Sequence, residues 1–80
     1  MGPMTSASQP ATTVHIDRAV RVNDALSMVW LQDCHGPVEP GDVVRVVDLD
    51  TGAYGGGQIY WVNEKHHVVY LSVGELTLPR

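Results

Sequence analysis

The chain has 80 residues, a formal net charge of −4 and a single cysteine. A chain of this length forms one small domain, and such a domain buries only about 60% of the surface of its unfolded chain. The single cysteine excludes an internal disulfide, and no apolar run approaches the roughly 20 residues of a membrane-spanning helix. No signal-peptide pattern is evident either. The sequence therefore predicts a cytoplasmic protein, and its Arg, Val and Gly content suggests a bacterial or phage origin.

The N-terminal part of the chain is predicted to be a polar segment followed by a strand. Residues 1–12 are expected to form a disordered arm, because small polar residues and two prolines leave nothing to bury. Residues 13–80 are expected to form one domain. Its first strand alternates polar residues with the apolar residues Val14, Ile16, Val20 and Val22.

Residues 24–34 fit two interpretations. Asn23 or Asp24 can cap a helix, and Gly36 follows where that helix would end. The alternative is a strand with Leu26, Met28 and Trp30 on one face. The flanking residues favour one short helix.

Three further strands are predicted over residues 43–49, 58–62 and 67–73, with a short edge strand at residues 76–78. Pro40-Gly41-Asp42 marks the turn before them, and Asp50-Thr51-Gly52 marks the next turn. Three glycines, residues 55–57, predict a flexible loop or a place where the backbone passes close to another segment. One inward row is expected to be buried: Val44, Val46, Ile59, Val69 and Leu71. Because Phe is absent, the Trp and Tyr residues together with the Leu and Ile residues are expected to supply the large core side chains.

The sequence gives no support for catalysis, and we expect no enzyme activity, no catalytic residue and no cofactor. A domain of this size is not expected to hold a cleft of several hundred Å³, as a substrate site requires. The calcium-loop pattern at Asp48 fails, since Ala53 stands where glycine is needed and Ile59 where glutamate is needed. The glycine run lacks the Lys and Ser/Thr of a phosphate-binding loop.

A metal site is not expected from the histidines and the cysteine. His66 and His67 are adjacent, so in a strand they would point to opposite faces. His15, Cys34 and His35 lack the paired spacing of structural zinc ligands, and they could converge only through the fold. The folded domain should therefore need no metal.

Exposed aromatic residues give the best indication of a working surface. Tyr60 and Trp61 are consecutive in a predicted strand, so only one of them can face the core. Tyr54 and Asp50 flank the same hairpin. Exposed Tyr and Trp are typical anchors of protein–protein contacts, so these four residues form the candidate protein-binding site.

The run PGDVVRVVDLDTG…GQIYWVNEKHHVVYLSV, within residues 38–73, resembles the SH3-like barrel superfamily, in its KOW and Tudor branches. The likeness rests on a Gly-Asp turn, a Val-rich strand, glycine, an Ile/Val strand, a short hairpin and another Val strand. The resemblance implies a small antiparallel barrel of about five strands that binds protein, peptide or RNA.

The sequence thus predicts a mainly β, SH3-like domain that acts as a non-catalytic protein-interaction module, either accessory or structural. The net negative charge favours a partner with a basic segment. A homo-oligomer could form through an edge strand. The alternative is a nucleic-acid-associated, KOW-like module that uses Arg18, Arg21 and Arg45, provided that folding gathers them on one face. A small metal-binding protein is the least favoured interpretation.

Overall fold

The computed structural model describes residues 12–79, so most of the predicted N-terminal arm lies outside the described residues. Thr12 was assigned to that arm, yet it is buried, and its hydroxyl donates a hydrogen bond to the carbonyl of Pro37. The folded part of the chain therefore already includes Thr12.

Seven strands and a 3₁₀ helix follow one another along these residues. In chain order they are β1 (Thr13–His15), β2 (Val20–Arg21), β3 (Ser27–Trp30), the 3₁₀ helix η2 (Leu31–Asp33), β4 (Cys34–His35), β5 (Val43–Val47), β6 (Tyr54–Asn63) and β7 (Val68–Val73).

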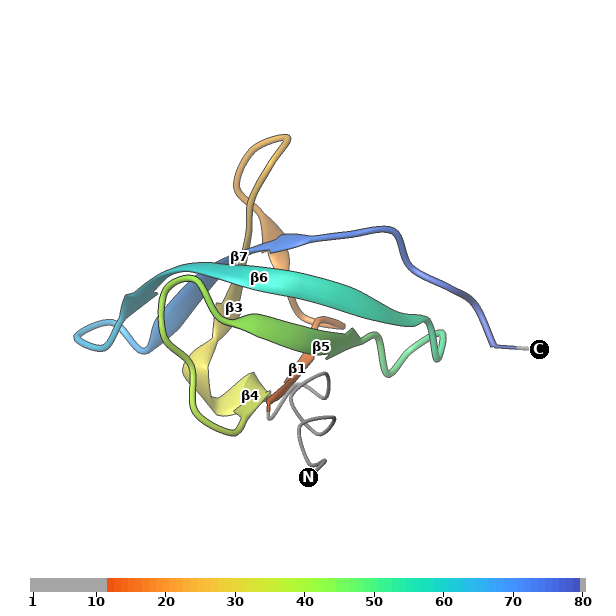
Figure 1. Ribbon diagram of the computed structural model, residues 1–80, viewed down its shortest axis with the longest axis horizontal. Helices are drawn as coiled ribbons and strands as arrows, with labels where there is room; N and C mark the ends of the chain where they lie inside the picture. The colour runs from red at the N-terminus through yellow and green to blue at the C-terminus, as the bar shows by residue number, and fades with distance from the viewer. Residues whose placement is uncertain (1–11, 80) are drawn as a thin grey trace, which may run out of the picture.

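All seven strands belong to one sheet in the order β2-β3-β7-β6-β5-β1-β4 (Figure 1). Neighbouring strands are antiparallel except β1 and β5, which are parallel. The mainly β class is confirmed, whereas the sheet has seven strands instead of about five and is mixed instead of purely antiparallel. β1 and β2 lie in opposite halves of the strand order although only residues 16–19 join them, so the sheet must curve strongly.

The predicted first strand is interrupted. Val14 in β1 is buried, but the chain turns directly after β1, where the Ala19 amide donates to the carbonyl of Ile16. Val20 in β2 is exposed, because β2 pairs only with β3 at the far end of the sheet. The alternating pattern therefore spans two separate strands with different surroundings.

Residues 24–34 hold a turn, β3, η2 and the first residue of β4, so the favoured α-helix is wrong and the alternative, a strand, is confirmed for residues 27–30. The Oδ1 atom of Asn23 accepts hydrogen bonds from the amides of Ala25 and Leu26, at 2.7 and 2.9 Å. This is a turn built by an Asn side chain, and it closes the β2–β3 hairpin. β3 then pairs with β7 over four residues, with Val29 buried and Trp30 exposed. Pairing with a distant strand has overridden a local helix signal.

The predicted inward row is confirmed: Val44, Val46, Ile59, Val69 and Leu71 are all buried, together with Val14 and Val29. Of the large core side chains expected, only the Leu/Ile part is confirmed: the large fully buried side chains are all Val, Ile or Leu, and none is aromatic. Short aliphatic side chains therefore fill this core.

The glycine run lies inside β6, where residues 55–57 pair with residues 44–46 of β5. The flexible-loop interpretation is therefore wrong, and the close-approach interpretation is confirmed. A Cβ atom on Gly55 or Gly57 would lie 2.7 Å from the carbonyl oxygen of Glu75 or Ser72, respectively. The turn between β5 and β6 lies earlier, at Gly52, which has a φ of 80°.

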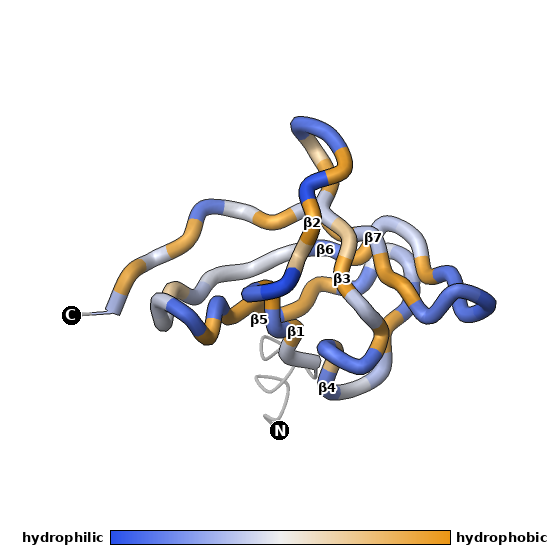
Figure 2. The backbone as a smooth tube through the Cα atoms, turned by 180° about the vertical axis from the view of Figure 1, so that it is seen from behind, coloured by the Kyte–Doolittle hydropathy of each residue, from blue (hydrophilic) through white to orange (hydrophobic). Residues whose placement is uncertain are grey.

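The predicted edge strand at residues 76–78 is reduced to one bridge. Tyr54 and Thr77 exchange two backbone hydrogen bonds, of 2.9 and 2.7 Å. The β2–β3 and β6–β7 hairpins both end in polar tips that project from the body of the sheet, as Figure 2 shows.

Candidate interaction surface

A β-bulge sets the exposure of the two consecutive aromatics on β6. The register between β6 and β7 shifts between Ile59 and Trp61, which leaves Tyr60 as the extra residue. Tyr60 is 65% exposed and Trp61 is 55% exposed. The expectation that one of the pair faces the core is therefore wrong: a bulge inserts one residue, so two successive side chains can both avoid the core.

The bulge lies where β6 loses one neighbour. The amide of Ile59 donates to the backbone carbonyl of Asp42, and the carbonyl of Ile59 accepts from the amide of Gly41. Beyond this point, residues 61–63 of β6 pair with β7 alone. The two aromatics therefore stand at the open end of the strand, free of β5.

Trp61 belongs to an apolar row that crosses four strands. Trp61 lies opposite Tyr70, Tyr70 opposite Met28, and Met28 opposite Val20. Directly opposed residues project from the same face of a sheet and interact. Tyr70 lies between two buried residues of β7, so this face points away from the core. We call these four residues the apolar row.

The ends of the apolar row are the more exposed. Val20 is 53% exposed and Trp61 55%, while Met28 and Tyr70 are partly buried. Trp30 follows Met28 by two residues on β3, so it lies on the same face and is also exposed. Sequence reasoning identified Trp61 but missed Val20 and Met28, because their position beside it depends on strand pairing between distant segments.

The structure does not gather all four predicted protein-binding residues. Tyr54 begins β6 six residues before Tyr60, which places it about 20 Å away along the strand. Tyr54 contacts the C-terminal segment through Thr77, and Asp50 lies in the turn between β5 and β6. Tyr54 and Asp50 therefore lie at the opposite end of β6 from Tyr60 and Trp61.

Two of the arginines proposed for nucleic-acid binding lie on opposite faces of the sheet. Arg45 lies between two buried valines of β5, so its side chain points outward. Arg21 lies opposite Ser27, and Ser27 lies opposite the buried Leu71, so Arg21 is on the core-facing side at the sheet edge.

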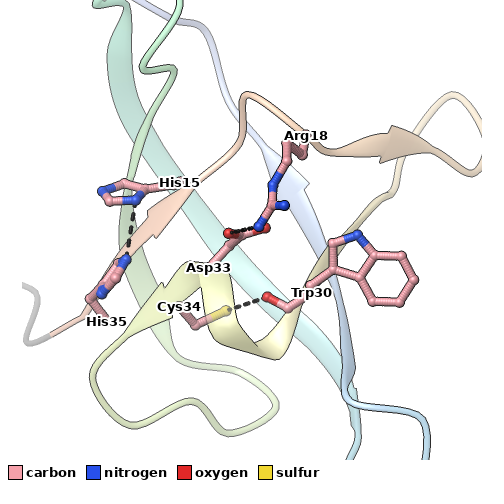
Figure 3. Close-up of polar contacts among 6 residues, drawn as sticks. All are labelled: His15, Arg18, Trp30, Asp33, Cys34 and His35. Carbon is pink, nitrogen blue, oxygen red and sulfur yellow. Dashed lines mark hydrogen bonds and ion pairs between the residues drawn. The ribbon is translucent and has the colours of Figure 1, made fainter.

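Arg18, in the turn between β1 and β2, is already engaged. Its Nη2 atom lies 2.7 Å from Oδ1 of Asp33 in η2 (Figure 3). This hydrogen bond and the carboxylate charge raise the pKa of the Arg18 guanidinium above its ordinary value. Oδ2 of Asp33 is buried and lacks a partner among the described residues. The ion pair links the β1–β2 turn to η2.

A hollow of about 460 Å³ lies beside this ion pair, which corrects the expectation that no cleft of several hundred Å³ exists. Its walls come from three segments, with the lining residues Arg18, Trp30, Leu31, Gln32 and His67. His67 has a φ of 58°, and its carbonyl accepts a hydrogen bond of 2.7 Å from the amide of Leu31. This lining contains no paired nucleophile and base, the arrangement that covalent catalysis requires.

The potential metal ligands are distributed over two places. His15 and His35 meet across β1 and β4, whereas His66 and His67 lie in the turn between β6 and β7. Cys34 is directed elsewhere: its thiol donates to the carbonyl of Trp30 at 3.8 Å (Figure 3). Within residues 12–79, no group of three or more His, Cys, Asp or Glu side chains converges.

Burial, and secondarily the charge of Asp33, raises the pKa of the Cys34 thiol from 9.0 to about 11. The thiolate is the reactive species, so the native protein should react with iodoacetamide about a hundredfold more slowly at pH 8 than the urea-unfolded chain. The pKa of the thiol is higher in the folded chain than in the unfolded chain. The contribution of the protonated thiol to stability is therefore fully present below pH 9.0 and is lost as the pH rises through about 11.

The alkylation rate is measured by mass spectrometry in buffer containing EDTA, which suppresses oxidation of the thiol. Equal rates for the native and unfolded chains would show that Cys34 is not shielded in this way.

Comparison with models of known protein families, with curated proteins and with solved structures finds no match. No helix in residues 12–79 is long and apolar enough to cross a membrane.

Proposed function

We propose that this protein is a non-catalytic protein-interaction module and that the apolar row, with Tyr60 and Trp30 beside it, is its docking surface. The observation that carries the proposal is an outward-facing row of apolar side chains running continuously across β6, β7, β3 and β2. Scattered single apolar residues are normal on a surface, whereas a contiguous patch marks a site of interaction. Trp, Tyr and Met are the residue types enriched in such interfaces.

We also propose a distant relationship to the SH3-like barrels. The short strands, the strong curvature of the sheet and the aliphatic core support it. The parallel pairing of β1 with β5 departs from the antiparallel pattern that the resemblance implies.

The partner we propose is a protein segment with apolar side chains flanked by basic residues. The net charge of −4 favours a positive partner through electrostatic steering. Acidic residues stand in the turns at the ends of the strands that carry the row: Asp24 in the β2–β3 turn and Glu64 in the β6–β7 turn. A flanking Lys or Arg of the partner could pair with either of them.

Replacing Trp61 with Ala should weaken partner binding by about 2 kcal/mol, which is roughly a thirtyfold rise in Kd. The indole is more than half exposed in the free protein, so its loss should leave the fold intact. The partner is first isolated by affinity capture from host extract and quantitative mass spectrometry, comparing wild type with Trp61→Ala. The Kd of each variant is then measured by calorimetry.

Tyr54→Ala is the matched control, because Tyr54 is a similarly exposed aromatic on the same strand but at its other end. We expect its Kd to stay near that of the wild type. If Tyr54→Ala or a proline at Thr77 abolishes binding while Trp61→Ala does not, the docking surface is the C-terminal edge instead. A nucleic-acid ligand that depends on Arg45 would replace the proposal altogether.

A further inference from the structure

His15 and His35 are brought together by the pairing of two very short strands. Thr13 lies opposite His35 and Val14 opposite Cys34, so His15 is the diagonal neighbour of His35 on the same face of the sheet. Nδ1 of His15 lies 3.1 Å from Nε2 of His35 (Figure 3). The two residues are twenty positions apart in the sequence; His15 is partly buried and His35 is exposed.

The two rings lie partly alongside each other. Their centroids are 4.3 Å apart and their planes are tilted by 51°, although the nearest nitrogens are 3.1 Å apart. If the two rings met head-on, the distance between their centroids would equal the nitrogen–nitrogen distance plus one ring radius for each ring. The observed centroid distance is shorter than that sum, so the contact is bent. The two ring nitrogens therefore do not point straight at each other.

A nitrogen separation of 3.1 Å matches that of two imidazoles on one metal ion. With metal–nitrogen bonds of about 2.0–2.1 Å, it corresponds to a nitrogen–metal–nitrogen angle of roughly 95–102°. This value lies between the right angle of octahedral or square-planar coordination and the tetrahedral angle. Ni²⁺, Cu²⁺ and Zn²⁺ are the ions that imidazole ligands suit.

From this geometry we infer that His15 and His35 form a two-histidine chelating site for a divalent transition-metal ion. The ion replaces the proton shared between the two ring nitrogens, and water occupies its other positions. A third protein ligand does not converge within residues 12–79, and residues 1–11 contain no His, Cys, Asp or Glu. Cys34 is turned toward Trp30 and does not contribute.

Binding at this site would tie β4 to β1 at one end of the sheet. Because the two imidazoles meet only in the folded chain, an ion that binds them stabilises the native state. The metal-free protein keeps its fold, since the core does not depend on these residues. EDTA should therefore leave the melting temperature of metal-free protein unchanged, while added Ni²⁺ should raise it. This site is independent of the proposed docking surface.

The test uses the full chain without affinity-tag histidines and titrates it with Ni²⁺ by calorimetry and thermal melting. Wild type should bind one ion, and the paramagnetic ion should broaden the amide resonances of residues 13–15 and 34–35. His15→Gln and His35→Gln should each weaken binding at least about tenfold, because the second ligand then no longer acts intramolecularly. Melting in EDTA establishes that each variant is folded, and His35→Gln, at an exposed position, is the safer of the two.

His66→Gln is the matched control, since it also removes one exposed histidine but from the β6–β7 turn. It should retain the wild-type affinity and the Ni²⁺-induced rise in melting temperature. The proposal is overturned if wild type binds no Ni²⁺, if the His15 and His35 variants bind it as tightly as wild type, or if His66→Gln loses binding to the same degree.

Discussion

Replacing Leu71 with Ala should destabilise the protein by about 2–4 kcal/mol, the range for removing a large aliphatic side chain from a packed core. Leu71 is fully buried and lies between Ile59 of β6 and Ser27 of β3, so its side chain fills the centre of the sheet's inner face. The free energy of unfolding of a small domain lies near the lower end of the range of about 5–15 kcal/mol, so this loss is a large share of the total stability.

The free energy of unfolding of Leu71→Ala is measured by urea titration, with melting as a second readout. In a domain of this size each kcal/mol should lower the melting temperature by roughly 4–8 °C. Leu78→Ala is the matched control, because Leu78 is 66% exposed and should cost little. An unchanged melting temperature for Leu71→Ala would contradict the strand register described here, since a shift by one residue exchanges the two faces.

Gly57→Ala should cost about 3 kcal/mol, at the upper end of the range for overpacking a core. A Cβ atom at this position would lie 2.7 Å from the carbonyl oxygen of Ser72 and 3.2 Å from Cγ1 of Val46. The carbonyl belongs to the backbone of β7 and cannot rotate away. Either β6 and β7 must separate locally or the pairing of Gly57 with Val73 must be lost.

Gly56→Ala provides the comparison within the same run of glycines. The nearest atom to its added Cβ is the carbonyl oxygen of Val44, at an ordinary contact distance of 3.9 Å. This substitution should be neutral, or stabilise by about 0.4–1 kcal/mol by restricting the unfolded chain. Both variants are compared by urea titration. Equal destabilisation by the two substitutions would favour a requirement for flexibility over the close approach.

The sequence alone was sufficient to predict the β class, the inward row and most of the turns. Val44, Val46, Ile59, Val69 and Leu71 alternate with outward residues, and alternation is a local property that strand geometry translates directly into burial. The turns at Gly41 and Gly52 were visible for a similar reason: both residues have positive φ, which glycine adopts without strain.

Elements whose structure depends on a distant partner were not predictable in this way. Asn23 is a helix-capping residue type, but it makes a hairpin turn here because β3 has β7 to pair with. A run of glycines is typical of a loop in a sequence. Here glycines stand in a strand because β6 passes so close to the backbone at Ser72 and Glu75 that a side chain would not fit.

Both candidate sites arise from such long-range pairing. Tyr60 and Trp61 are both exposed because of a register shift against β7, and Val20 and Met28 join Trp61 only through the order of the sheet. His15 meets His35 because β4 returns to the edge of β1. The sequence pattern determines which face of a strand is apolar. Which strands become neighbours is decided by the packing of the whole chain, because the backbone hydrogen bonds between strands do not depend on residue type.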